Sequence, residues 1–149
     1  MSIRPSRNPS RLLLRSLADF RFELRSFLLF SEQAALHAGL QPQQHQLLLQ
    51  VAGANDTASV TIAYVAGRLG LKHNSTVGLV DRSEGEGLLV RVEDPRDRRR
   101  IQLRVTRKGE KVLHQLASEH ARELNVLAPV LLTALERVRN HANAPTEVK

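Results

Sequence analysis

A short hairpin with a densely charged tip is the feature that most limits how this chain can fold. Residues 87–93 and 101–106 each alternate apolar with polar side chains, which is the period of two expected of half-buried strands. Between them lies Asp94-Pro95-Arg96-Asp97-Arg98-Arg99-Arg100, a turn whose guanidinium groups must stay in water or against a polyanion. The alternation predicts one shared, buried apolar face. Its members are Leu88, Val90, Val92, Ile101, Leu103 and Val105.

Positive charge is concentrated around this hairpin. The 149-residue chain has 22 Lys and Arg against 15 Asp and Glu, a formal net charge of +7. Residues 91–108 alone hold eight basic side chains and three acidic ones. Charge of one sign gathered in one segment marks a binding surface better than charge spread evenly. The distribution therefore favours a polyanionic partner such as nucleic acid.

Composition argues against a secreted or membrane protein. Without cysteine the chain can form no disulfide and no thiolate metal site, which is compatible with a reducing cytoplasm. It has no apolar run of about 18 residues that could span a membrane. Residues 1–18, rich in Arg and Ser and free of acid, are similar to an organelle transit peptide. We interpret them instead as a basic arm that leads into a helix and can also touch DNA, in a cytoplasmic protein.

No arrangement of residues points to catalysis or to metal binding. The six histidines include no pair at i, i+4 spacing and adjoin no carboxylate cluster, so we expect no metal. No set of nucleophile, base and orienting group can be assigned either. We therefore expect neither enzyme activity nor a cofactor.

Apolar residues recur at helical spacing through the first third of the chain. They predict a helix over about residues 11–37, preceded by a flexible basic tail at 1–10. Gly39 ends this helix. Pro42 opens the next one, over about 43–53, because a first-turn proline lacks only an amide hydrogen that has no partner there.

Two further helices precede the hairpin. One covers about residues 60–69 and ends at Gly70, which can take the left-handed conformation of a C-terminal cap. After a tight turn, Asn74 or Ser75 caps another, which ends at about 83–87. Helix, turn, helix and charged hairpin, in this order, are typical of a winged helix-turn-helix.

The C-terminal third is predicted to be helical. Thr106 can cap a long helix, and Pro129 kinks or breaks it, so that a last helix reaches about residue 140. The apolar stripes of the two chain ends have nothing to pack against except each other, which favours a homodimer. The sequence thus predicts a mainly α fold with a small β-hairpin. Its parts are a flexible tail at 1–10, one domain at 11–140 with dimerisation helices at about 11–37 and 107–140 and a winged helix-turn-helix at about 43–106, and a flexible tail at 141–149.

These parts resemble one known family. From about residue 60 to 109 the chain resembles the MarR family of multiple-antibiotic-resistance-type transcriptional regulators, and the flanking helices are similar to that family's dimerisation helices. In combination the matching segments are specific, above all the charged turn followed by a strand and Thr-x-x-Gly. The segments are Val65-Ala66-Gly67-Arg68-Leu69-Gly70-Leu71, His73-Asn74-Ser75-Thr76-Val77-Gly78-Leu79-Val80-Asp81-Arg82, Gly87-Leu88-Leu89-Val90-Arg91, Asp94-Pro95-Arg96-Asp97-Arg98-Arg99 and Thr106-Arg107-Lys108-Gly109.

The resemblance implies that the second helix of the helix-turn-helix enters the major groove of DNA. Its N-terminal side chains would meet base edges, where Asn can pair bidentately with adenine. Alternatively Asn74 or Ser75 is only the helix cap, because capping and base contact compete for the same oxygen. The candidate base contacts are His73, Asn74, Ser75 and Thr76, and the candidate phosphate contacts are Lys72 and Arg82.

The resemblance also implies that the wing contacts the DNA backbone and the neighbouring minor groove. We place Arg96 in that groove, since a narrow A·T-rich groove has the deepest negative potential. Asp94 and Asp97 would fix the turn by pairing with neighbouring guanidinium groups. The remaining candidates along the backbone, which are alternatively solvated bystanders, are Arg98, Arg99 and Arg100.

A small aromatic or phenolic effector is a further implication, because related regulators bind such ligands between the dimerisation helices and the DNA-binding lobe. For the three phenylalanines the alternative is a plain core role at helical spacing. The candidate lining residues are Phe20, Phe27, Phe30, His37 and His45.

Together these inferences predict a sequence-specific regulator that binds a pseudo-palindromic operator in double-stranded DNA. It would be a homodimeric repressor released by a small molecule. One alternative is a basic architectural or RNA-binding protein without base readout or ligand response. Another is a module whose charged hairpin docks an acidic protein. Preference for an operator over competitor DNA separates the three.

Overall fold

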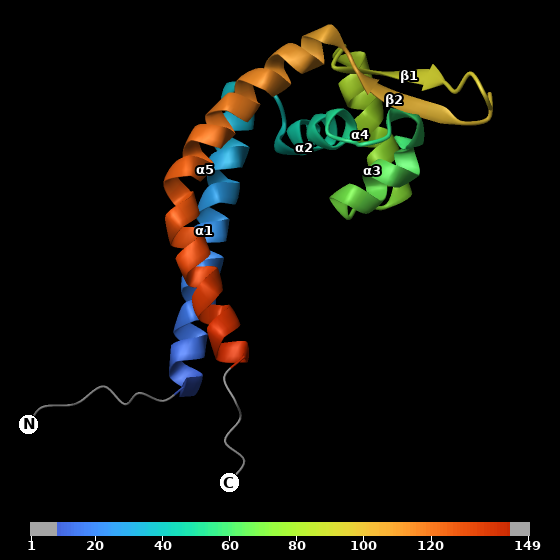
Figure 1. Ribbon diagram of the computed structural model, residues 1–149. Coiled ribbons are helices and arrows are strands. Elements are labelled where there is room, and N and C mark those ends of the chain that lie inside the picture. Colours follow the sequence, from blue (N-terminus) through green and yellow to red (C-terminus); the bar gives the residue numbers. More distant parts are fainter. Residues whose placement is uncertain (1–8, 144–149) are drawn as a thin grey trace, which may run out of the picture. The chain divides into compact units, whose positions relative to one another are not determined.

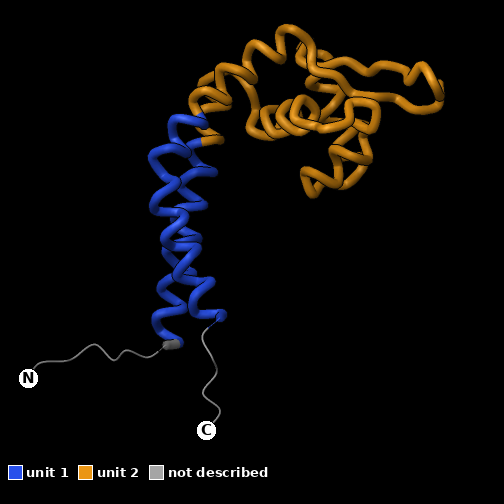
Figure 2. The backbone as a smooth tube through the Cα atoms, in the orientation of Figure 1, with its two compact units in different colours: residues 1–30, 120–149 blue, residues 31–119 orange. Residues whose placement is uncertain are grey.

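The chain divides into two units, which we call the helical unit and the winged unit (Figure 2). The computed structural model describes residues 9–143. The helical unit comprises residues 1–30 and 120–149, and the winged unit comprises residues 31–119. No helix among the described residues is long and apolar enough to cross a membrane. In chain order the elements are α1 (Pro9–His37), α2 (Pro42–Ala52), η1 (Thr57–Ser59), α3 (Ile62–Leu69), α4 (His73–Gly85), β1 (Leu89–Glu93), β2 (Ile101–Val105) and α5 (Arg107–Ala142) (Figure 1).

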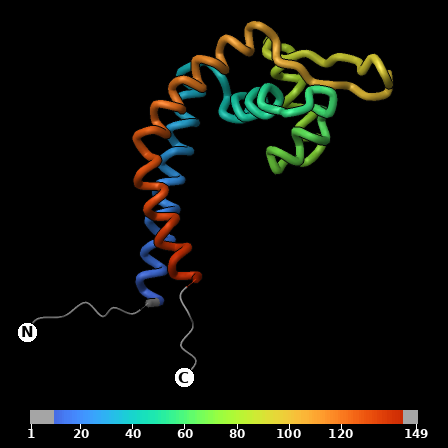
Figure 3. The backbone as a smooth tube through the Cα atoms, in the orientation of Figure 1, coloured from blue at the N-terminus to red at the C-terminus, as the bar shows by residue number. Residues whose placement is uncertain are grey.

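The helical unit is an antiparallel pair formed by most of α1 and the second half of α5 (Figure 3). Ser16 of α1 and Ala134 of α5 are buried. The rings of Phe27 and Phe30 meet the ring of His120 edge-on, with centroids 5.9 and 5.4 Å apart. Edge-to-face packing of this kind stabilises a helix pair beyond the area that it buries.

Much of the apolar surface of this pair remains exposed. Phe22 is 68% exposed and Val126 is 71% exposed, although both are large and apolar. Large apolar side chains exposed in this number favour a surface that binds a partner. The other exposed apolar side chains of the unit are Leu12, Leu14, Leu17, Leu24, Leu28, Leu29, Leu124, Val130, Leu132 and Leu135.

The end helices are longer than the sequence predicts. α1 begins at Pro9, inside the predicted tail, since proline is tolerated in a first helical turn. α5 continues without interruption through Pro129, so the prediction of a separate last helix is wrong. It also includes His141, which was assigned to the C-terminal tail. The rest of the two predicted tails, residues 1–8 and 144–149, lies outside the described residues.

The winged unit is built on a core of leucine and valine. Helices α2, α3 and α4 contact one another and the hairpin, and the largest apolar side chains of the unit are completely or almost completely buried. The outer edge of β2 is also covered, because Leu103 N donates to Val60 O at 2.8 Å. The leucine and valine residues of the core with the least exposure are Leu47, Leu48, Val60, Val65, Leu79, Val80, Leu89, Leu103 and Leu116.

Local signals place most helix ends correctly. Pro42 is the first residue of α2, as predicted. Gly70 follows α3 with φ +64°, which confirms the predicted left-handed cap. Thr106 precedes α5, and its hydroxyl oxygen accepts a hydrogen bond from Gly109 N at 3.2 Å. These three positions each depend only on residues nearby in the chain.

The hairpin forms as predicted, but the set of residues predicted for the buried face of its first strand is wrong by one position. Leu89 stands opposite Val105 and Arg91 stands opposite Leu103, and directly opposed residues share a face. Val90 and Val92 therefore lie on the other face, and Val90 is 41% exposed.

The shift arises where the chain leaves α4. Gly87 has φ +71°, and Leu88 N donates to Ser83 O at 3.0 Å, so Leu88 still belongs to the turn that closes the helix. Leu88 and Leu89 are consecutive and both buried. Two adjacent buried residues break the alternation, because one is buried by the turn and the other by the sheet.

The start of α5 is hydrogen-bonded to the turn that closes α4. The hydroxyl of Thr106 donates to Gly87 O, and Lys108 Nζ donates to Glu86 O at 2.8 Å. Gly109 packs so closely on the Leu88 carbonyl that a Cβ at this position would overlap the oxygen and lie 2.7 Å from Val105 Cγ1. The base of the wing is thus packed so closely that any side chain at residue 109 would displace its neighbours.

Candidate nucleic-acid interface

The N-terminus of α4 presents polar side chains to solvent. His73, Asn74 and Ser75 occupy its first turn and are all exposed. The residue before the helix is Lys72, with φ −68° and ψ 152°, and no side chain caps it. The prediction that Asn74 or Ser75 is the cap is therefore wrong. Because the helix already begins at His73, the polar groups of Asn74 and Ser75 are not used for capping. They are therefore able to contact base edges.

Thr76 does not belong to this exposed set. It is fully buried, and its hydroxyl donates to Lys72 O at 2.9 Å. Lys72 O also accepts from Thr76 N at 3.0 Å. The prediction of Thr76 as a base contact is therefore wrong, because the side chain faces the core of the winged unit.

Arg82 lies exposed on the last turn of α4. Its Nη1 would lie 3.5 Å from a Cβ placed on Gly78, so the guanidinium group folds back along the helix. Lys72 is exposed at the opposite end of the helix. Both side chains are long enough to reach for phosphates, and that role stays a prediction.

Two aspartates shape the wing turn through backbone amides. Asp94 Oδ1 accepts from Arg96 N at 2.9 Å, and Asp97 Oδ1 accepts from Arg99 N at 3.0 Å. The turn is closed by Asp94 N donating to Arg100 O at 3.0 Å. The prediction that the aspartates fix the turn through guanidinium groups is thus corrected: within the turn they accept hydrogen bonds from backbone amides, as in Asx turns.

The buried Asp94 carboxyl is kept in its charged form. The hydrogen bond from the Arg96 amide lowers the pKa of this carboxyl below its usual value, against the opposing effect of burial. A hydrogen bond from Gln102 and the charges of Arg100 and Arg96 lower it further. Hydrogen bonds that a carboxylate accepts stabilise its charged form and therefore lower its pKa.

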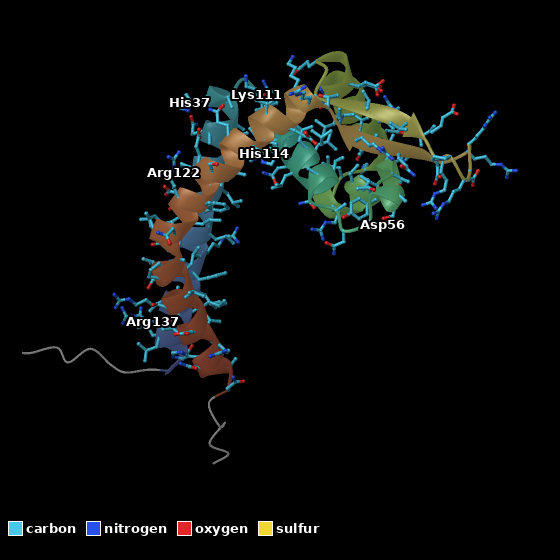
Figure 4. The ribbon with its side chains drawn as sticks, turned by 45° about the horizontal axis from the view of Figure 1, so that its top comes forward. His37, Asp56, Lys111, His114, Arg122 and Arg137 are labelled. Carbon is cyan, nitrogen blue, oxygen red and sulfur yellow. The ribbon has the colours of Figure 1, made fainter. Side chains whose placement is uncertain are left out.

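The guanidinium groups of the four wing arginines are available to bind a partner. All four are exposed, and among residues 9–143 no hydrogen bond or ion pair engages their side chains. Side chains spread outward from the tip of the hairpin (Figure 4). Exposed guanidinium groups on a fixed turn are suited to bidentate binding of phosphate. The four are Arg96, Arg98, Arg99 and Arg100.

Arg91 has a role that the sequence reading missed. In the sequence analysis it is included among the basic side chains that favour a polyanionic partner. In the structure its Nη2 lies 2.6 Å from Asp81 Oδ1 and its Nη1 lies 2.9 Å from Glu84 Oε2. The hydrogen bond to Asp81 raises the pKa of Arg91, and the bond to Glu84 adds to this. The signal was the spacing of the two acids, since residues three apart share a helix face.

The residues proposed to line an effector pocket are divided between the two units. Phe27 and Phe30 pack on His120 in the helical unit, which agrees with a core role for these two rings. Phe20, also in the helical unit, is half-buried. In the winged unit, His45 is buried and His37 is exposed (Figure 4). The pocket stays a prediction.

Comparison with protein families matches the central part of the chain. Residues 38–100 match the model of the MarR family. YsmB of Bacillus subtilis (strain 168), an uncharacterized HTH-type transcriptional regulator, is 28% identical over 64 residues. This alignment covers 43% of the present chain and 44% of YsmB. The match thus spans less than half the length of that relative.

Solved structures share the fold over much more of the chain. CouR from Rhodococcus jostii RHA1, bound to p-coumaroyl-CoA, is 25% identical with a TM-score of 0.63, covering 99% of this chain and 100% of CouR. MepR of S. aureus in complex with DNA is 20% identical with a TM-score of 0.61, covering 74% of this chain and 79% of MepR. These similarities confirm the predicted mainly α winged helix-turn-helix fold.

Proposed function

We propose that this chain is a MarR-family regulator that binds specific sequences in double-stranded DNA, since its residues 38–100 match the model of that family. The observation that carries this proposal is the pairing of two exposed features in the winged unit. One is the uncapped first turn of α4, with His73, Asn74 and Ser75, and the other is the unoccupied arginine cluster of the wing. The first offers base-reading groups and the second offers phosphate-binding groups.

We propose that α4 reads the major groove while the wing contacts the backbone and the adjacent minor groove. The fold supports this proposal, since it is shared with MepR, which has been seen in complex with DNA. The wing is suited to the minor groove because Arg96 stands on a turn whose backbone is fixed by Asp94. We also propose a cytoplasmic location and a role in regulation rather than catalysis, which the match to the MarR family supports.

The exposed base-reading residues supply a direct test of sequence readout. Asn74→Ala is expected to reduce discrimination at one base pair of the operator by about 1 to 3 kcal/mol, because a bidentate amide contact is lost. The measurement is binding to a duplex selected from a randomised pool by the unmodified protein, compared with single-base variants of that duplex. Arg68→Gln on the neighbouring α3 serves as a control that should keep the base preference. A base preference unchanged in Asn74→Ala would contradict the assignment.

We propose a homodimer formed through the helical unit, because its apolar side chains stay exposed in a single chain. Two-fold symmetry would then set two copies of α4 on half-sites about 34 to 36 Å apart, one turn of DNA. Repression is the mode that we propose, with a pseudo-palindromic operator as target.

The dimer is tested by sedimentation. The unmodified chain is expected to sediment as a dimer at micromolar concentration, and Phe22→Lys is expected to shift it toward the monomer by placing a charge on an exposed apolar surface. Arg122→Lys, which keeps the charge of an exposed α5 residue, is the control (Figure 4). A monomeric unmodified chain at this concentration would refute the dimer.

We further propose that a small aromatic or phenolic ligand releases the protein from DNA. Support comes from the likeness to CouR, which was solved with p-coumaroyl-CoA. The alternative of an architectural protein without ligand response uses the same wing but needs no base readout. Equal affinity for the selected duplex and for unrelated DNA would favour that alternative.

A further inference from the structure

Arg91 ties the helix that we assign to base reading to the strand that leads into the wing. Its planar guanidinium group faces two carboxylates, Asp81 and Glu84, from one face of α4. Because Nη1 and Nη2 each bond a different carboxylate, the planar guanidinium group is held in its orientation as well as in its distance from α4.

The position of this link along β1 is what makes it informative. Leu89, two residues earlier on the same face, is fully buried, and so is Leu103 opposite Arg91. Beyond Arg91 the strand leaves the core, because Glu93 and nearly all of the turn that follows are exposed. Arg91 is therefore placed at the point where the hairpin projects from the body of the winged unit.

We propose that Arg91 is a positioning residue for DNA binding, which sets the angle between α4 and the wing. The inference rests on the proposed DNA-binding function. With the angle fixed, one protomer can engage the major groove through α4 and the neighbouring minor groove through the wing in a single register. Without it, the wing arginines stay charged but lose their alignment with the groove that α4 selects.

A role in positioning and a role in charge make opposite predictions for the carboxylates. Replacing Asp81 and Glu84 with their amides removes two negative charges, and charge alone would tighten binding to a polyanion. The same change also turns both ion pairs of Arg91 into weaker hydrogen bonds to neutral amide oxygens, which loosens the wing. The sign of the effect on affinity therefore distinguishes the two roles.

The experiment compares the double variant Asp81→Asn/Glu84→Gln with Arg91→Gln on a duplex selected by the unmodified protein. The double variant is expected to bind about fivefold more weakly although it has lost two negative charges, and a loss of this size is within the range that two exposed ion pairs can supply. Hydroxyl-radical footprints should lose protection at the flanking minor groove, while dimethyl sulfate footprints should keep protection of guanine N7 in the major groove. Arg91→Gln should give the same footprint, and Arg91→Lys, which keeps the charge without the planar guanidinium group, an intermediate one.

Lys111→Gln is the matched control, because Lys111 is an exposed cation of α5 (Figure 4). It should leave the footprint unchanged. Unchanged or tighter binding by the double variant, with the wing footprint intact, would overturn the positioning role. If Arg91→Gln fails to fold, the double variant still decides, since Asp81 and Glu84 are 60% and 40% exposed. If the unmodified protein selects no duplex, the proposed function itself fails, which is a different result from a failure of the variants.

Discussion

A variant without three of the wing arginines is expected to bind DNA at least about 100-fold more weakly at low salt. The substitutions are Arg96→Ala, Arg98→Ala and Arg99→Ala, and each removes a charge-assisted contact worth about 1.5 kcal/mol or more. The loss should fall on specific and unrelated duplexes alike, because phosphate contacts position the protein without reading its target.

Salt dependence supplies the sharper readout for this variant. The slope of log affinity against log salt should become shallower by about two to three, since each lost phosphate contact removes about 0.9 from it. Fluorescence anisotropy at several salt concentrations measures this slope. Arg96→Ala alone should lower the slope by about one, and Lys111→Ala, the same loss of charge outside the wing, should leave it nearly unchanged. Equal slopes for the triple variant and the unmodified protein would show that these arginines face solvent in the complex.

Gly109→Ala is expected to lower the free energy of unfolding by about 2 to 3 kcal/mol. A methyl group at this position overlaps the Leu88 carbonyl and crowds Val105, and the neighbours are backbone and core, which move only at a cost. The midpoint of thermal unfolding should fall by about 5 to 10 °C for a chain of this size.

A second glycine provides the matched control. Gly67 lies inside α3, and a Cβ added there has nothing within 4 Å. Gly67→Ala is therefore expected to stabilise the protein by as much as about 1 kcal/mol, through helix propensity alone. Circular dichroism melting curves of the two variants measure both effects. A Gly109→Ala protein that unfolds at the temperature of the unmodified chain would show that the base of the wing adapts easily.

The features that the sequence predicted well are those set by neighbouring residues. Gly70 and Pro42 act through their own backbone preferences, so the ends of α3 and the start of α2 were found where expected. The exposed arginines of the wing also follow from local composition. Asn74 was assigned two competing roles, and the structure removed the capping role because α4 begins with no side-chain cap at all.

The features that were missed depend on partners far along the chain. The phase of β1 is set by how Leu88 closes the turn after α4, which alternation along the strand does not encode. Once the phase is wrong by one residue, Arg91 is placed on the wrong face and its partners on α4 cannot be found. Thr76 was misassigned for a similar reason, since its burial depends on what packs against that face of the helix.

The unbroken course of α5 bears on how this protein can be cut or recombined. The chain passes between its two units twice, and both crossings fall inside helices, within α1 after residue 30 and within α5 after residue 119. A fragment limited to residues 31–119 would have helix backbone at both cut ends, with amide and carbonyl groups left unsatisfied. A protease would need two cuts through hydrogen-bonded helix to release it. A chimaera that transfers the DNA-binding specificity to another scaffold therefore has to splice two helices in register, at both crossings at once.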